Sequence, residues 1–265
     1  MKRSKSDYVI QTVTNALRLL EEFQRDSELG VTELSKRLAL HKNNVFRLLA
    51  TLEQRGYVEQ CRGSERYRLG ARCAEVAQAF SRNTSLVRYA RGELEELARS
   101  TRESAHLGIL DRFQVVHLDG EQGDQLLGTL LRVGQRLDAH STALGKAILG
   151  CGDAALREDY DREWIRGGEL TGHTAATITD RDKFFEHLRM VASQGYALDV
   201  GECAEGLSCA SAPIYGRGGA VVGALSISGP GSRLDTEVLR DSAVPQVLAA
   251  AERLSRHLGW AGSTG

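Results

Sequence analysis

The chain has 265 residues, 42% of them hydrophobic, and its 34 Lys and Arg residues nearly balance its 35 Asp and Glu residues. This length suits one or two domains, and the composition is ordinary for a globular protein. No uninterrupted apolar run approaches the roughly 18 residues of a membrane span, and residues 1–7 lack the apolar stretch of a secretion signal. We therefore expect a cytoplasmic protein with no membrane partner and no transmembrane segment.

The five cysteines are odd in number and widely spaced, which predicts free thiols rather than a disulfide framework. Only Cys203 and Cys209 are close in sequence. No CxxC motif or matching histidine spacing accompanies them, so neither a structural metal nor a cofactor is expected.

The first quarter of the chain predicts three helices. The first is amphipathic, with apolar residues at helical spacing: Val13, Leu17, Leu20 and Phe23. Thr32 is expected to cap the second helix, in which Leu34 and Leu38 share one face. After a turn at residues 40–41, the third helix repeats apolar residues at the same spacing and stops at Gly56. Two short helices joined by a tight turn are typical of a helix-turn-helix that reads DNA.

Polar side chains occupy the exposed face of the third helix. Asn43, Asn44, Arg47 and Thr51 project opposite its apolar residues, and Lys42 lies near its start. Asn can pair with adenine and Arg with guanine in the major groove, and Lys can neutralise a phosphate. A solvated helix face would have the same composition, so the downstream residues have to decide between the two interpretations.

Residues 57–70 predict two short strands around a Gly-containing turn, a wing that carries Arg62, Arg66 and Arg68. From residue 36 to residue 72 there are nine Lys or Arg and only three Asp or Glu. Residues 1–70 carry a net charge of plus four and the remainder minus five. Such local positive charge suits a DNA backbone, whose binding draws on counterion release by clustered cations. We expect a winged helix-turn-helix domain over residues 1–70, with Thr32 also at the DNA-facing side.

Six stretches, in order, resemble the IclR family of bacterial transcriptional regulators: NALRLL (15–20), RLLATLEQRGYV (47–58), YRLG (67–70), HSTALGKA (140–147), GYALD (195–199) and LSISGP (225–230). The resemblance runs from about Val9 to Leu258. It implies a ligand-responsive repressor or activator with a GAF-like effector domain. Residues 41–44 read HKNN where many members have PKST, so the operator sequence does not follow from the resemblance.

The remaining residues read as an α+β domain. Residues 71–84 predict a linker helix, and residues 85–265 an antiparallel sheet flanked by helices. Ser85 is expected to cap a helix over residues 86–100, and Thr179 a helix that continues through residue 191. Asp235 is expected to cap a last helix that reaches residue 258 and is bent near Pro245. Strand-like runs occupy 105–110, 115–118, 126–133, 209–215 and 220–228, the last two forming a hairpin.

The resemblance places an effector pocket beside the sheet, on Ala143, Leu144, Asp199, Cys209, Ser226 and Ser228. The residues suit a small carboxylate or a keto or sugar acid, since backbone N–H groups of Ala143 and Leu144 at a helix start form an anion site. Ser226 and Ser228 face the same way on a strand. Leu126, Leu137 and Leu207 are expected to supply apolar walls.

Two other functions remain open at this point. The regulator could instead respond to a metal or an oxidant through Cys203 and Cys209, with His106 or His117. A hydrolase with an appended helical domain is the competing class, with His140, beside Ser141 and Lys146, as its best catalytic candidate. No GxSxG, HExxH or P-loop motif supports it, so no catalytic residue is assigned.

The expected assembly is a homodimer or homotetramer on a pseudo-palindromic double-stranded operator, because paired reading heads match paired half-sites. A small acidic effector would shift the population of domain arrangements and thereby control a catabolic operon.

Overall fold

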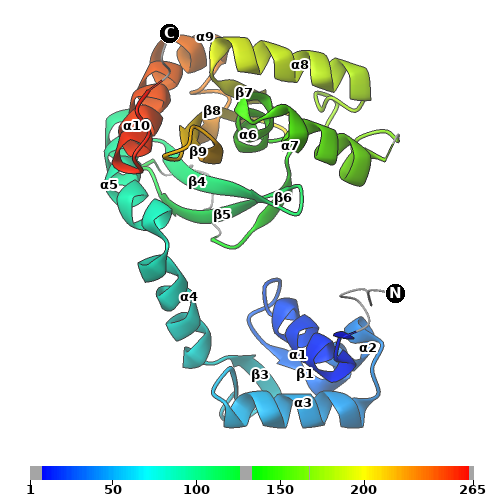
Figure 1. The fold of residues 1–265 in the computed structure, drawn as a ribbon. Helices are drawn as coiled ribbons and strands as arrows, with labels where there is room; N and C mark the ends of the chain where they lie inside the picture. The colour runs from blue at the N-terminus through cyan, green and yellow to red at the C-terminus, as the bar shows by residue number, and fades with distance from the viewer. Residues whose placement is uncertain (1–7, 126–132, 167, 263–265) are drawn as a thin grey trace. The chain divides into compact units, whose positions relative to one another are not determined.

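A computed structural model describes residues 8–125, 133–166 and 168–262 (Figure 1). The chain divides into two compact units, Met1–Asn83 and Thr84–Gly265. No helix in the described part of the chain combines the length and the apolar character needed to cross a bilayer.

The first unit packs three helices against a three-stranded antiparallel sheet of order β1-β3-β2, and a fourth helix follows (Figure 1). Its elements are α1 (Gln11–Glu22), β1 (Leu29–Gly30), α2 (Val31–Leu38), α3 (Lys42–Gln54), β2 (Val58–Gln60), β3 (Arg66–Leu69) and α4 (Ala71–Asn83). Strands β2 and β3 form the predicted wing hairpin.

The core of this unit joins the predicted apolar faces of α2 and α3 to α1, with Leu34, Val45 and Leu49 fully buried. The prediction for α1 was wrong in part, because its buried residues are Leu19 and Phe23. Val13 and Leu17 are 53% and 55% exposed. The face of α1 that contacts the core is therefore rotated from the predicted one and contains Leu19 rather than Val13 and Leu17.

The expected cap of α2 was also wrong. The helix begins at Val31, and the N-cap position is Gly30, whose N–H donates to the Glu33 carboxylate at 2.8 Å. Thr32 consequently lies inside the first turn. At the other end, Ala39 adopts a left-handed conformation (φ 53°) and makes the tight turn into α3.

The second unit is built on a six-stranded antiparallel sheet of order β6-β5-β4-β9-β8-β7. Its strands are β4 (Ser104–Asp111), β5 (Gln114–Glu121), β6 (Arg136–Asp138), β7 (Ala197–Val200), β8 (Leu207–Tyr215) and β9 (Val221–Pro230). The helices are α5 (Ser85–Thr101), α6 (Ala143–Cys151), α7 (Ala154–Asp159) followed by the π-helix η2 (Tyr160–Ile165), α8 (Arg181–Gln194), α9 (Thr236–Val238) followed by the π-helix η3 (Leu239–Ala243), and α10 (Val244–His257).

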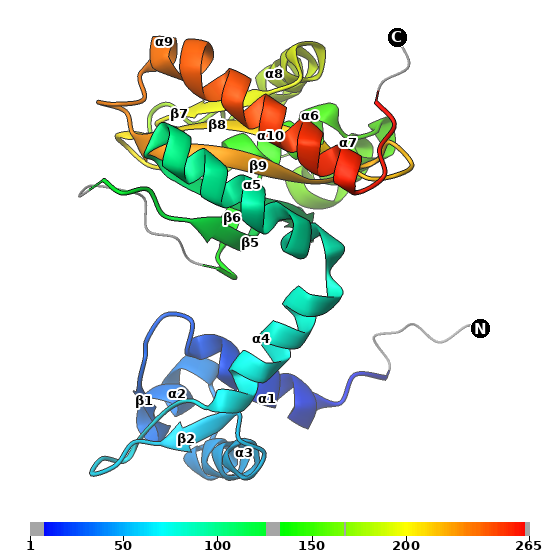
Figure 2. The same ribbon diagram turned by 90° about the vertical axis from the view of Figure 1, so that its left-hand side faces the viewer.

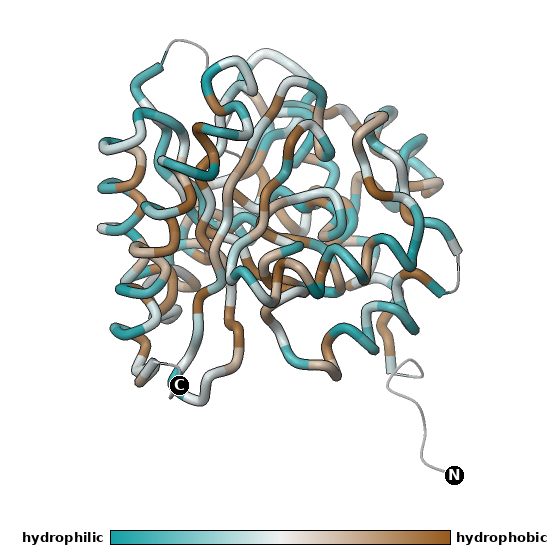
Figure 3. The backbone as a smooth tube through the Cα atoms, turned by 90° about the horizontal axis from the view of Figure 1, so that it is seen from above, coloured by the Kyte–Doolittle hydropathy of each residue, from teal (hydrophilic) through white to brown (hydrophobic). Residues whose placement is uncertain are grey.

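Helices cover both faces of this sheet. Helices α5 and α10 pack side by side on one face (Figure 2), where Leu94 and Leu254 meet Leu107, Leu225 and Ile227. Helices α6 and α8 cover the other face, with Leu149, Phe184 and Leu188 in a second core. Hydrophobic and hydrophilic residues alternate along the flanking helices as this packing requires (Figure 3). The predicted α+β class is confirmed, with an N-terminal helix-turn-helix and a GAF-like C-terminal sheet.

Several predicted boundaries are confirmed and others are not. The hairpin of β8 and β9 forms, and Asp235 caps α9, accepting from the N–H groups of Glu237 and Val238. The last helical segment is interrupted just before Pro245, at η3. Ser85 and Thr179 are not caps: Thr84 and Asp180 hold those positions, and Asp180 accepts from Lys183 N at 2.8 Å. The expected strand at 126–133 lies outside the described residues except for Val133, which is in a turn.

Candidate DNA-reading face and ligand pocket

Helix α3 presents the predicted recognition residues to solvent. His41 caps it, its Nδ1 accepting from Asn43 N at 3.3 Å. Lys42, Asn43 and Asn44 form the exposed first turn, and Arg47 follows one turn later on the same side. Arg47 makes no ion pair with any described residue, so its guanidinium is available for an external partner.

Both threonines predicted to contact DNA lie at the surface. Thr51 is exposed, but its hydroxyl donates to the Arg47 carbonyl at 2.8 Å within α3. Thr32 is exposed in the first turn of α2. Sequence reasoning missed Phe46, which is 57% exposed on α3, three residues after Asn43. That helical spacing was the available signal.

The wing arginines divide into two kinds. Arg62 is exposed at the hairpin turn beside Gly63, whose φ of 78° makes glycine suitable there. Arg66 instead donates to the Glu28 carbonyl at 2.8 Å and pairs with Glu33 at 3.0 Å. Arg68 pairs with Glu59 at 2.6 Å. Of the three, Arg62 alone has no ion-pair partner among the described residues.

The second unit assembles a polar row across its sheet. In register, Asp199 on β7 faces Cys209 on β8, which faces Ser228 on β9. The next row on the same face joins Ser211, Ser226 and the β4 residue His106. Their sequence neighbours, such as Leu107 and Ile227, turn to the opposite face and enter the core beneath α5 and α10. Strand alternation thus gathers the polar residues on the face toward α6.

The first turn of α6 lies against this face. Thr142 caps the helix, its hydroxyl accepting from Gly145 N at 3.1 Å. The N–H groups of Ala143 and Leu144 have no intrahelical acceptor, because they open the helix. Gly145 fixes the position of the turn: a Cβ there would lie 2.2 Å from the Ala139 carbonyl oxygen. The backbone therefore approaches the 139–142 loop more closely than any other residue would permit.

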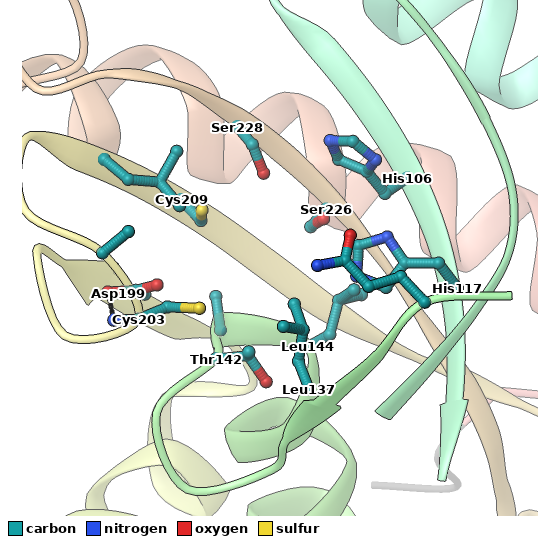
Figure 4. Close-up of a pocket in the computed structure, with 14 residues that line it drawn as sticks. His106, His117, Leu137, Thr142, Leu144, Asp199, Cys203, Cys209, Ser226 and Ser228 are labelled. Carbon is teal, nitrogen blue, oxygen red and sulfur yellow. Dashed lines mark hydrogen bonds between the residues drawn. The ribbon is translucent and has the colours of Figure 1, made fainter. Parts of the chain in front are cut away.

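A cavity of about 460 Å³ lies between the sheet and α6 (Figure 4). Eight of the nine predicted effector residues line it: Leu137, Ala143, Leu144, Asp199, Leu207, Cys209, Ser226 and Ser228. The ninth, Leu126, lies outside the described residues. The cavity is completed by residues that were not assigned to an acid-binding pocket from sequence: His106, His117, Gln135, Thr142, Cys203 and Ala204. The alternation of His106 with Ala105 and Leu107 could have placed it on the polar face.

Asp199 is a buried pocket residue with one carboxylate oxygen satisfied and the other without a hydrogen-bond partner in the described part of the chain. It is 1% exposed, and its Oδ1 accepts from Glu202 N at 2.7 Å and Cys203 N at 3.3 Å. Its Oδ2 has no hydrogen-bond partner among the described residues. Burial raises the pKa of this carboxyl to about 6, against the opposing effect of the Lys146 ammonium. A buried oxygen without a partner is costly unless a ligand supplies one.

A buried ion pair supports the same corner of the pocket. Lys146 on α6 is fully buried and pairs with Glu202, whose backbone carbonyl accepts from the Thr177 hydroxyl at 2.7 Å. Lys146 thus connects α6 to the loop that carries Cys203 and Ala204.

Burial disfavours the thiolate form of both pocket cysteines. Burial raises the pKa of Cys203 to about 11 and that of Cys209 well above its ordinary value. Oxidation and metal binding proceed through the thiolate, which these surroundings disfavour. Within the described ranges, no group of three or more His, Cys, Asp or Glu residues is arranged to hold a metal ion.

His140, the catalytic candidate, lies in a structural position. It is 1% exposed, its Nε2 hydrogen-bonds the Thr171 carbonyl oxygen at 2.8 Å, and its ring stacks on His173. The neighbouring Lys146 is committed to Glu202. His140 is not among the residues that line the described cavity.

Comparison with known proteins identifies both units. Residues 12–62 match the IclR helix-turn-helix domain, and residues 78–256 match the model described as bacterial transcriptional regulator IclR C-terminal. The HTH-type transcriptional regulator KdgR of Escherichia coli K12 is 34% identical over 251 residues, covering 95% of this chain and 94% of that protein. The glycerol operon regulatory protein of Streptomyces coelicolor is 34% identical, covering 92% and 93%.

A solved structure shares the fold. An IclR homologue from Microbacterium hydrocarbonoxydans, complexed with 4-hydroxybenzoate, superposes with a TM-score of 0.81 at 24% identity, covering 94% of this chain and 98% of that one. The chain therefore belongs to the IclR family and is a DNA-binding transcriptional regulator, not an enzyme.

Proposed function

We propose that this regulator responds to a small carboxylic acid bound in the cavity between α6 and the sheet. The observation that carries the proposal is that Ala143 and Leu144, which open α6, line the same cavity as Ser226 and Ser228. N–H groups at a helix start favour an anion, and the serines can donate to its oxygens. The 4-hydroxybenzoate complex of a relative is consistent with an acid in this fold.

Asp199 would accept a hydrogen bond from a hydroxyl group of such an acid, or from a water bound beside it. Its unpartnered Oδ2 accepts from a ligand hydroxyl, while Cys209 offers a weaker thiol contact. Leu137, Leu144 and Leu207 supply the apolar walls that exclude water. A hydroxy, keto or sugar acid meets both ends of this pocket.

On the DNA side, we propose that Asn43, Asn44 and Arg47 contact base edges and that Lys42 and Arg62 contact phosphates. The exposed first turn of α3 suits the N-terminal approach of a recognition helix to the major groove. Thr32 and Thr51 would make further polar contacts with the DNA backbone. The ion pair and carbonyl contact of Arg66 favour a supporting role in holding the wing against α2.

The proposed regulatory mechanism is a shift in the relative populations of two arrangements of the regulator. An acid that binds one arrangement of the dimeric or tetrameric regulator more tightly changes the spacing of its DNA-reading heads on a pseudo-palindromic site. The operon that it controls would be catabolic, and the regulator itself would be cytoplasmic. The relative from Streptomyces coelicolor is likewise the regulatory protein of an operon.

A thermal-shift screen of small hydroxy, keto and sugar acids on the full chain tests the ligand proposal. At least one acid should raise the melting temperature of the wild-type second unit. The same acid should give little or no shift after Ser226→Ala with Ser228→Ala. No stabilisation by any acid, or an equal shift in the double variant, contradicts the proposed site.

A further inference from the structure

Helix α3 carries one aromatic side chain that the core of its unit does not use. Phe46 is 57% exposed and is the only large hydrophobic residue of Lys42–Gln54 with such exposure. Its neighbour Val45 is fully buried in the core of the first unit, to which Phe46 does not belong. Helices α1 and α2 lie on the same side of α3, and its other side is uncovered (Figures 1 and 2). Single exposed apolar residues are common on protein surfaces, so the position of Phe46 has to decide its role.

That position is on the face that we propose reads DNA. At about 100° per residue, Phe46 lies about 60° from Asn43 on one side, and Arg47 lies about 40° from it on the other. Ala50, which is also exposed, falls between Asn43 and Phe46 in this projection. Along the helix axis, Phe46 is about 4.5 Å beyond Asn43, little more than the roughly 3.4 Å between neighbouring base pairs. The ring is therefore expected at the level of the base pair next to the one that Asn43 contacts.

The surroundings of Phe46 favour DNA over a protein partner. Lys42 and Asn43 precede it by one helical turn, Glu53 follows it by two, and all three are polar and exposed. The ring is thus not part of the contiguous apolar patch that marks a protein interface. The local charge is positive, because residues 36–72 contain nine Lys or Arg and three Asp or Glu. A single aromatic ring among cations and amides matches a polyanion with few apolar groups.

The major groove presents such an apolar group at thymine. The C5 methyl of thymine projects into the groove, and phenylalanine is one of the side chains that contact it. The remaining base-edge groups there are hydrogen-bond donors and acceptors, which a phenyl ring cannot pair. A phenyl ring also has no charge with which to neutralise a phosphate.

We propose that Phe46 is a specificity-determining residue that contacts the C5 methyl group of a thymine, in the base pair beside the one contacted by Asn43. This inference rests on the proposed DNA-reading role of α3 and adds an apolar contact to its polar ones. Burial of one methyl group corresponds to about fourfold in affinity.

Fluorescence anisotropy on uracil-substituted DNA tests the contact. The template is the sequence that the full chain selects from a random library, and each of its thymines is replaced in turn by uracil. Uracil lacks the C5 methyl group and keeps the hydrogen-bonding groups of thymine. At one position or more, uracil should weaken binding of the wild-type chain by about fourfold. Phe46→Ala should bind the thymine and uracil forms of that site equally, and Phe46→Leu, which remains apolar, should keep part of the preference.

Arg47→Ala is the matched control on the same face of α3. It should bind the thymine DNA more weakly than the wild-type chain does, but keep the preference for thymine over uracil at the position that Phe46 reads. Phe46→Ala should keep the melting temperature of the wild-type chain, because the ring lies outside the core.

The outcomes separate the methyl contact from the DNA-reading role on which it rests. If the selected sequence contains no thymine, or tolerates uracil at every position, the contact is wrong while DNA reading by α3 stands. The same uracil effect in Phe46→Ala as in the wild-type chain, or its complete loss in Arg47→Ala, also overturns the contact. A lowered melting temperature of Phe46→Ala would assign the ring a structural role instead. If the chain selects no DNA sequence at all, the proposed DNA-reading role itself fails.

Discussion

The two units place their functional groups in opposite environments. The residues of α3 that we propose read DNA, such as Asn43 and Arg47, are exposed on a helix whose other face is the core. The pocket residues, such as Asp199 and Ser226, are almost completely buried on the inner face of a sheet. An exposed reader can change its residues with little consequence for folding. The residues of a buried pocket are also part of the folded interior. Their unsatisfied polar atoms therefore lower the stability of the unit that contains them.

This difference predicts where substitutions act. Changes in the pocket should alter the free energy of unfolding as well as ligand affinity. Changes on the outer face of α3 should alter DNA affinity and leave the free energy of unfolding within about 0.5 kcal/mol.

The largest effect is expected at the buried ion pair. Lys146→Met leaves the Glu202 carboxylate buried without its cation, which should destabilise the second unit by about 3–5 kcal/mol. Urea unfolding of the full chain measures the loss. The matched control is Arg256→Met, which removes an exposed pair with Glu252 at 2.7 Å and should cost no more than about 1 kcal/mol. Similar losses for the two variants would contradict the comparison.

A pH-dependent effect is expected at Asp199. Its pKa rises from 3.8 to about 6 on folding, so between about pH 4 and pH 6 the folded chain binds more protons at this site than the unfolded chain. The free energy of unfolding therefore falls as pH rises through that window, and the full cost, about 3 kcal/mol for two pKa units, is present above it.

Asp199→Asn removes this cost and keeps the oxygen that accepts from Glu202 N and Cys203 N. The variant should be about 2–3 kcal/mol more stable than the wild type at pH 7.5 and no more stable at pH 4, by chemical denaturation at each pH. A gain that is the same at both pH values would rule out the charge of Asp199 as its source.

A smaller effect, confined to DNA, is expected at Arg47. Arg47→Ala should weaken specific DNA binding by about 1–3 kcal/mol and relax base preference at one position, with an unchanged melting temperature. Fluorescence anisotropy on DNA selected from a random library measures both. Arg66→Ala is the informative contrast, because loss of its contacts to Glu28 and Glu33 should lower the stability of the wing. If Arg47→Ala binds the selected DNA with unchanged affinity and preference, Arg47 is not a base contact.

The sequence predicted the parts of each unit that follow from local periodicity. Helical spacing identified the buried and exposed faces of α3, and two-residue alternation placed Ser226 and Ser228 on one face of β9. Both rules depend only on neighbouring residues. The family resemblance supplied the remaining pocket residues, such as Ala143 and Asp199, at positions that line one cavity.

Contacts distant in sequence were not predictable in the same way. Arg66 meets Glu33 across 33 residues, which no local pattern reveals, and Lys146 meets Glu202 across 56. His106 and His117 converge because β4 pairs with β5, in a register interrupted by a bulge after Leu107. From sequence alone these histidines suggested a metal or redox site, and their common orientation toward a ligand pocket required the sheet.

The most direct test of the account measures DNA affinity with and without ligand. The full chain is titrated onto its selected DNA in the absence and presence of the acid that stabilises it most. The account predicts a change of about fivefold or more in DNA affinity, corresponding to at least 1 kcal/mol of coupling, and no change in the Ser226→Ala, Ser228→Ala variant. Identical DNA affinity with and without an acid that demonstrably binds the wild-type chain would contradict it.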